Sequence, residues 1–231
     1  MKRAIVWARQ INRALADQYF YPLMLSSALA LGLFAGRVYL YHTTTFRFLV
    51  WNLILAWLPY VWSVWAASIH RRYPRRWWSL LVPGALWLLF FPNAPYILTD
   101  FLHLYQRPPV PLWYDIGLLA SFAWAGCFLA VASLSMMHTI IKDYVGQRMS
   151  WLFVLAILSL SGLGIYVGRF LRWNSWDLVL YPGDVLYDIG HRLIHPFRNL
   201  QAYGVTLMFA AFLFVCYWTF VSIRRQTEPS Q

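Results

Sequence analysis

The stretch FFPNAPYILTDFLHL, Phe90–Leu104, places two prolines, Pro92 and Pro95, at the end of a long apolar run. Proline lacks a backbone N–H, and its ring clashes with the carbonyl group four residues earlier in a helix. The apolar run before the prolines, Trp78–Phe91, would span only about 21 Å as a helix, whereas the hydrocarbon core of a bilayer is ~30 Å thick. If this run is a membrane-spanning helix, the prolines therefore fall inside the membrane, before the helix has crossed it.

These prolines predict that the helix bends or stops. Phe91 and Ala94, which precede the prolines, are expected to leave helical backbone angles, and Asn93 can cap the segment that resumes. Free backbone groups are costly in hydrocarbon, and broken helices occur where protein or a water-filled cavity supplies partners. We therefore expect a partly polar recess beside the break. The alternative is a plain proline kink whose backbone groups are satisfied locally.

The composition indicates the fold class. Of the 231 residues, 61% are hydrophobic and 12% are charged, whereas soluble domains carry about 25% charged residues. Several apolar runs reach the ~18 residues that indicate a membrane span. The sequence predicts an all-α, polytopic transmembrane bundle of about six helices, with a proline-broken third helix. The predicted spans are about Tyr21–Tyr41, Arg47–Ile69, Trp77–Leu98, Leu112–Met137, Trp151–Phe170 and Tyr203–Ile223.

The basic residues predict the orientation. The formal net charge is +11, but the basic residues flank apolar spans and form no solvated face, which disfavours nucleic acid as a partner. If the N-terminus is cytoplasmic, twelve of the nineteen Lys and Arg residues lie inside, including those of the short loop His70–Arg76. By the positive-inside rule, both termini are cytoplasmic. The cytoplasmic Lys and Arg residues are expected to contact anionic lipids.

The predicted spans divide the chain into three parts. Residues 1–20 form a basic cytoplasmic or interfacial segment, residues 21–223 form a single transmembrane domain with an outer loop at 171–202, and residues 224–231 form a cytoplasmic tail. Five of the eight acidic residues fall on the outer side. Within the fifth predicted span, Gly162, Gly164 and Gly168 indicate close helix packing.

Polar side chains from distant parts of the chain meet in the predicted outer layer. Asp100 and His103 lie three residues apart, share a helical face and are candidate acid–base catalysts. Ionisable groups at such depth favour a functional role, although ion pairs that hold helix ends together are the alternative. The predicted ligand-binding residues are Asn93, Arg169, Arg172, Asn174, Asp177 and Asp115.

The outer loop contains a second polar pattern. YPGD, Tyr181–Asp184, is a turn that leads into a predicted amphipathic helix, lying on the outer surface or folded over the bundle. Asp184, Asp188, His191 and His195 are spaced four, three and four residues apart, so they share one face of that helix. Carboxylates and imidazoles on one face can bind a divalent metal, and a hydrated polar face is the alternative. No other cofactor is implied.

Two motifs carry a family resemblance. FFPNAPYILTDFLHL together with GRFLRWNSWDL, Gly168–Leu178, resembles the bacterial membrane family known as domain of unknown function 1361, over about Leu33–Trp218. The resemblance implies a multi-span protein of the bacterial inner membrane and brings no established activity. It supports the choice of the outer polar layer and leaves the roles of its residues open.

Three functions remain open from the sequence. The first is a membrane protein whose outward-facing recess of Asp, His, Arg and Asn binds a small ligand or lipid head group, with catalysis as an extension of that role. The second is a non-enzymatic subunit or scaffold that packs against partner membrane proteins. The third is a transporter, which fits the broken helix but not the lack of an internal repeat and of charges in mid-membrane.

Overall fold

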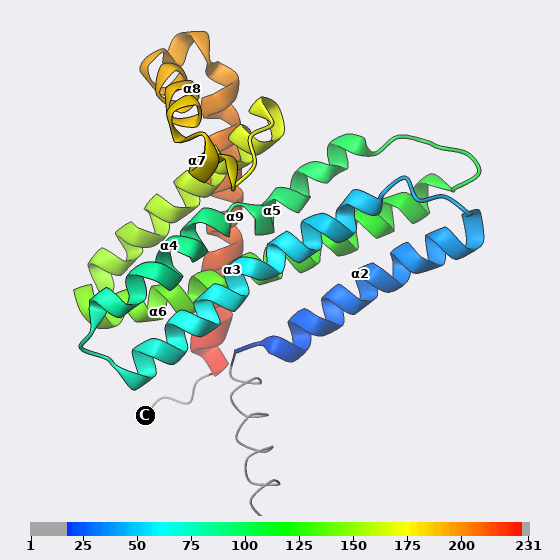
Figure 1. The fold of residues 1–231 in the computed structure, drawn as a ribbon. Helices are drawn as coiled ribbons and strands as arrows, with labels where there is room; N and C mark the ends of the chain where they lie inside the picture. The colour runs from blue at the N-terminus through cyan, green and yellow to red at the C-terminus, as the bar shows by residue number, and fades with distance from the viewer. Residues whose placement is uncertain (1–17, 228–231) are drawn as a thin grey trace, which may run out of the picture.

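The computed structural model describes residues 18–227, and in that part of the chain every regular element is helical (Figure 1). The predicted all-α fold is therefore confirmed. The α-helices are α2 (Phe20–Tyr41), α3 (Arg47–Arg72), α4 (Leu81–Phe90), α5 (Asn93–Tyr96), α6 (Leu112–Tyr166), α7 (Asp177–Leu180), α8 (Pro182–Ile194) and α9 (Leu200–Thr227). Shorter helical segments are Trp77–Leu80, Ile97–His103, Val167–Leu171 and Pro196–Arg198.

The number of apolar stretches differs from the prediction of six. Between residues 18 and 227, five helical stretches are long and apolar enough to cross a membrane: Phe20–Tyr41, Arg47–Arg72, Trp77–His103, Leu112–Leu171 and Leu200–Arg224. The difference arises because one stretch of 60 residues replaces the predicted fourth and fifth spans. A straight helix of that length would measure about 90 Å, three times the thickness of the hydrocarbon core.

The chain reverses direction inside that stretch. Gly146 has φ 80° and ψ 173°, a conformation outside the helical region that glycine adopts readily. His138 Nε2 and Ser150 Oγ lie 3.0 Å apart, although twelve residues of straight helix would separate them by about 18 Å. Helix α6 therefore has a first arm, 112–145, and a second arm that begins at residue 147. The second arm continues directly into Val167–Leu171, and we include that segment in it. Figure 1 shows the two arms in green and yellow-green.

The chain around the two prolines stays helical in its backbone angles. Phe91 (φ −55°, ψ −41°) and Pro92 (φ −60°, ψ −23°) both lie in the right-handed helical region, so the prediction that Phe91 leaves it is wrong. The hydrogen-bond pattern changes instead: α4 ends, α5 makes a single turn, and the tighter segment Ile97–His103 follows. Asn93 does not act as an N-cap: it is the first residue of α5, whose N-cap is Pro92, and neither α5 nor Ile97–His103 has a side-chain cap bond. Its Nδ2 instead donates to Phe90 O (3.1 Å) and Ser175 Oγ (2.9 Å).

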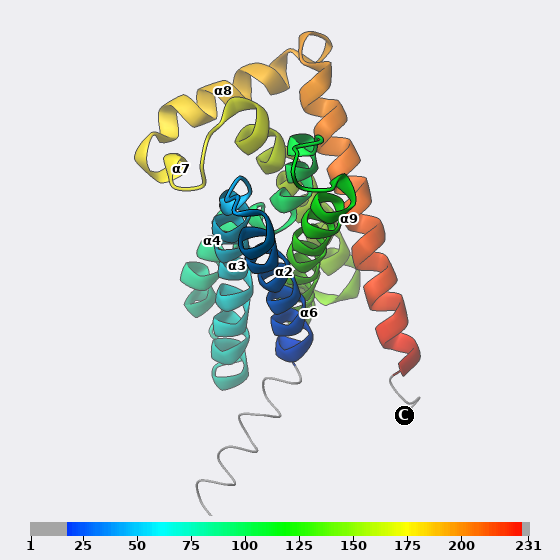
Figure 2. The same cartoon turned by 90° about the vertical axis from the view of Figure 1, so that its right-hand side faces the viewer.

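Helix α6 forms the centre of the bundle. It contacts α2, α3, α5 and α9, while α3 also contacts α4 and α5. Figure 2 shows α8 lying across one end of the bundle, at a steep angle to the long helices, and the turn between α3 and α4 at the opposite end. The predicted helix after the YPGD turn is confirmed as α8, with Asp184 in its first turn.

Glycines bring α6 close to its neighbours, as the sequence predicted for the second arm. At three glycines of the second arm, an added Cβ would meet an atom of another segment of the chain inside normal van der Waals distance. Side chains larger than glycine would therefore push the helices apart. The close approaches of the second arm are Gly162 to Thr206, Gly164 to Pro92 and Gly168 to Tyr96.

Replacing Gly126 by Ala should destabilise the protein by about 1–3 kcal/mol, the usual cost of overpacking, because the new Cβ would collide with the Ala94 carbonyl oxygen of α5. Gly32 on α2 is the matched control, since an added Cβ there meets nothing within 4 Å. Gly32→Ala should gain up to about 1 kcal/mol from helix propensity. Unfolding in detergent micelles measures both values, and an equal response of the two variants would contradict the packing argument.

Candidate functional site

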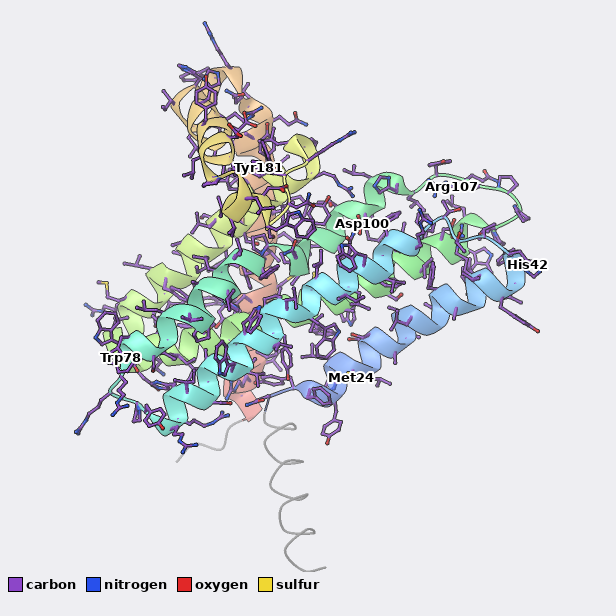
Figure 3. All side chains as sticks on the ribbon, in the orientation of Figure 1. Met24, His42, Trp78, Asp100, Arg107 and Tyr181 are labelled. Carbon is purple, nitrogen blue, oxygen red and sulfur yellow. The ribbon has the colours of Figure 1, made fainter. Side chains whose placement is uncertain are left out.

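Asp100 lies in the segment Ile97–His103, and its residue is only 1% exposed. Figure 3 places it toward the end of the bundle that carries Arg107 and Tyr181, away from Trp78 at the other end. Both carboxylate oxygens are occupied: Asn52 Nδ2 donates to Oδ2 (2.8 Å) and Arg169 Nη2 donates to Oδ1 (2.9 Å). The fold thus joins α3, the proline-containing segment and the end of the second arm of α6 at one carboxylate.

The Arg169 guanidinium connects several groups of this layer. Its Nη2 also donates to Thr99 O, and its Nη1 lies 3.1 Å from His103 Nε2. Because a guanidinium only donates hydrogen bonds, His103 Nε2 is the acceptor in this contact. The guanidinium carbon also lies 5.2 Å from the centre of the Tyr96 ring. We call this set the Asp100–Arg169 cluster; it comprises Asn52, Tyr96, Thr99, Asp100, His103 and Arg169.

Asp115 lies outside this cluster, with a different arginine. Arg37 Nε donates to Asp115 Oδ1 (2.7 Å) and Arg37 Nη2 to Oδ2 (3.3 Å), and both side chains are 1% exposed. Arg37 Nη1 also donates to the Thr43 carbonyl oxygen (3.3 Å), and the guanidinium carbon lies 4.9 Å from the centre of the Phe46 ring. This pair joins α2 to the first turn of α6, so its geometry is that of a structural contact.

A cavity of about 570 Å³ lies beside the Asp100–Arg169 cluster. This large cavity is bounded by α3, α4, α5, the second arm of α6, the segment 173–178 and α8. Its volume is within the range of small-molecule sites, roughly 300–1,000 Å³. Most of its lining residues are apolar, and the polar ones are Asn52, Asn93, Tyr96, Ser161, Asn174 and Ser175.

The cluster and the cavity share two residues. Asn52 lines the cavity while it donates to Asp100, and Tyr96 lines the cavity while its ring faces Arg169. Asp100 itself is not a lining residue. The buried ion pair therefore stands behind the cavity wall and fixes the orientation of the Asn52 amide.

Helix α8 covers the cavity with a face that carries both apolar and acidic side chains. Val185 and Ile189 line the cavity, and Asp188 turns toward the bundle, where Trp173 Nε1 donates to its Oδ2 (2.9 Å). That hydrogen bond holds the pKa of Asp188 below its usual range, and Arg192, whose Nη1 lies 3.2 Å from Oδ1, acts in the same direction. The Trp173–Asp188 bond thus ties α8 to the segment that follows the second arm of α6.

The four predicted metal ligands are not brought together as one site, and α8 ends at Ile194, so His195 lies just after the helix. Asp188 is engaged by Trp173, whereas Asp184, His191 and His195 are exposed. The His191 and His195 rings contact each other, with centres 5.0 Å apart. Within residues 18–227, no group of three or more His, Cys, Asp or Glu side chains is arranged to hold a metal ion.

The remaining predicted ligand residues separate into two groups. Asn93 and Asn174 line the large cavity. Asp177 makes a local turn contact, in which the Asn174 backbone N–H donates to its Oδ2 (2.7 Å). Arg172 is exposed and adopts a left-handed conformation with φ 64°.

Sequence reasoning missed several residues that shape this region. Asn52 and Ser175 line the cavity, and Arg37 neutralises Asp115. A signal existed for two of them, because Asn52 and Arg37 are polar residues within apolar runs, where such residues are costly unless they have partners. Ser175 carries no such signal.

Comparison with known proteins gives a family but no described relative. No curated protein and no solved structure matches the chain. Residues 51–216 match one family, which covers more than two thirds of the chain and includes every residue of the Asp100–Arg169 cluster and of the large cavity. The chain therefore belongs to the family described as "Protein of unknown function (DUF1361)".

Proposed function

We propose that the protein crosses the bacterial inner membrane six times, has both termini in the cytoplasm, and binds a lipid-like amphiphile in the large cavity on the outer side. The reversal at Gly146 supports six crossings, because each arm of the 60-residue stretch is longer than the ~20 residues needed to span the bilayer. The arginines of the turn after α3 support the orientation. Those same residues are suited to contact anionic lipids on the cytoplasmic side.

The observation that carries the binding proposal is the distribution of polar groups in the large cavity. Asn93, Asn174 and Ser175 gather near α8, and the Asn93–Ser175 hydrogen bond of 2.9 Å joins two of them. The rest of the wall is mainly apolar. A molecule with a hydrogen-bonding end and an apolar body matches this arrangement.

The cavity also has access to lipid. Trp51, Leu88 and Leu160 line it and are at the same time exposed on the outside of the bundle, by 53%, 42% and 50%. In a membrane these three side chains face acyl chains. An amphiphile can therefore reach the cavity sideways, from the bilayer, without passing through water.

The geometry favours binding over acid–base catalysis by Asp100 and His103. Both oxygens of Asp100 already accept hydrogen bonds, and neither Asp100 nor His103 lines the cavity. Their role in this proposal is to position Asn52, which does line it. We therefore assign Asp100, His103 and Arg169 as positioning residues.

A cavity-filling substitution tests the proposal. Ala85 is exposed and lines the large cavity, so Ala85→Trp should fill the cavity without disturbing the core. Wild-type protein purified in mild detergent should retain lipid, measured by native mass spectrometry and by extraction, and Ala85→Trp should retain about tenfold less.

Ala35→Trp is the matched control, because Ala35 is exposed on α2 and no residue of α2 lines the cavity. It should retain as much lipid as the wild type. Equal lipid content in all three proteins, or none in the wild type, would refute binding in the large cavity.

A further inference from the structure

A second cavity lies next to the large one. It measures about 200 Å³ and is bounded by the second arm of α6, α8 and the start of α9. Four residues line both cavities, so they form a partition between two neighbouring chambers. The shared residues are Leu160, Leu163, Val167 and Ile189.

The partition is mainly one ridge of one helix. Leu160, Leu163 and Val167 follow one another at spacings of three and four residues, so their side chains line up along one face of the second arm of α6. Ile189 of α8 lies against both chambers. The large cavity is on one side of this ridge, and the small cavity is on the other.

The small cavity is also mainly apolar. Leu171, Leu193 and Ala202 contribute to its wall, and Arg192 of α8 is its one charged lining residue. The Tyr203 hydroxyl group, which also belongs to the lining, donates to Leu193 O (2.7 Å). Arg192, whose Nη1 also donates to Asp188 O (2.8 Å) and Asp188 Oδ1 (3.2 Å), places a guanidinium, a good phosphate partner, beside a chamber whose other lining residues are uncharged.

We propose that the two cavities hold the two acyl chains of a single phospholipid from the outer leaflet. One chain lies in each cavity, the chains straddle the ridge of α6, and the head group lies under α8 between the Asn174 side and Arg192. A single-chain amphiphile would occupy one chamber only, whereas two joined chains match two apolar chambers that share a wall. This inference rests on the proposed function of the large cavity and specifies its ligand class.

The test compares two lipid probes that differ by one acyl chain. Phosphatidylglycerol and its single-chain lyso form are titrated onto delipidated full-length protein, and binding is followed by native mass spectrometry. Ser159 is exposed and lines only the small cavity. Ser159→Trp should weaken binding of the two-chain lipid by about tenfold and leave binding of the lyso form unchanged, whereas Ala85→Trp should weaken both by about tenfold.

The outcomes separate this inference from the function on which it rests. If Ala85→Trp weakens both probes but Ser159→Trp affects neither, or affects both equally, the large cavity binds lipid and the two-chain assignment is wrong. If the wild type binds neither probe, both proposals fall. Ala35→Trp serves again as the control, and Ser159→Leu, expected to act in the same direction, replaces Ser159→Trp if the latter does not fold.

Discussion

Replacing Arg37 by Met should lower the free energy of unfolding by about 3–5 kcal/mol, because it leaves the Asp115 carboxylate buried without its cation. The Arg37 and Asp115 side chains are each 1% exposed, so solvent screens their interaction very little. The variant also loses the bond from Arg37 Nη1 to the Thr43 carbonyl oxygen. Reversible unfolding in mixed detergent micelles gives the free energy directly.

The double variant Arg37→Met/Asp115→Leu should recover most of that loss. Removing both charges removes the uncompensated buried carboxylate, and apolar replacements of buried ion pairs are often neutral or stabilising. If the double variant is as unstable as Arg37→Met, the loss comes from the contacts of Arg37 with Thr43 or Phe46, and the charge argument is wrong.

The elements that the sequence predicted well are those decided locally. The apolar runs predict α2 and α3 to within a few residues, because length and composition alone define a membrane helix. The turn at Tyr181–Asp184 predicts the start of α8 for the same reason, since proline and an acidic residue suit the first helical turn.

Which arginine pairs with which buried carboxylate was harder to predict, because it depends on distances between helices. The sequence places Asp100 and Asp115 in one layer with several arginines, and nothing local says that Arg169 pairs with the first and Arg37 with the second. The side chains of α8 show a related limit. Helical spacing identifies Asp184, Asp188, His191 and His195 as one face, but only tertiary packing turns Asp188 toward Trp173 and leaves the histidines outside.

The surroundings of the prolines also depend on tertiary packing. Phe91 keeps helical angles, and beside it Asn93 Nδ2 donates to Phe90 O and to Ser175 Oγ, which is 82 residues away from Asn93 in the sequence. The cavities themselves are products of this packing. No single stretch of sequence contains the ridge, the α8 cover and the amides that together define them.

Replacing Arg169 by Met should destabilise the protein by about 3 kcal/mol, toward the lower end of the range for broken buried ion pairs. The Asp100 side chain is 1% exposed, but that of Arg169 is 14% exposed, so water reaches this pair more than the Arg37–Asp115 pair. Unfolding in the same micelles measures the difference, and a loss as large as that of Arg37→Met would contradict the ranking by exposure.

The double variant Arg169→Met/Asp100→Leu separates a positioning role from a purely structural one. It should regain stability, because no buried charge is left unpaired, yet the Asn52 amide loses the carboxylate that holds it at the cavity wall. Binding of phosphatidylglycerol should therefore stay about tenfold weaker than in the wild type. Arg37→Met/Asp115→Leu is the matched control and should bind normally, since the Arg37–Asp115 pair neither lines the cavity nor holds a residue that does. If lipid affinity returns together with stability, the Asp100–Arg169 cluster supports only the fold.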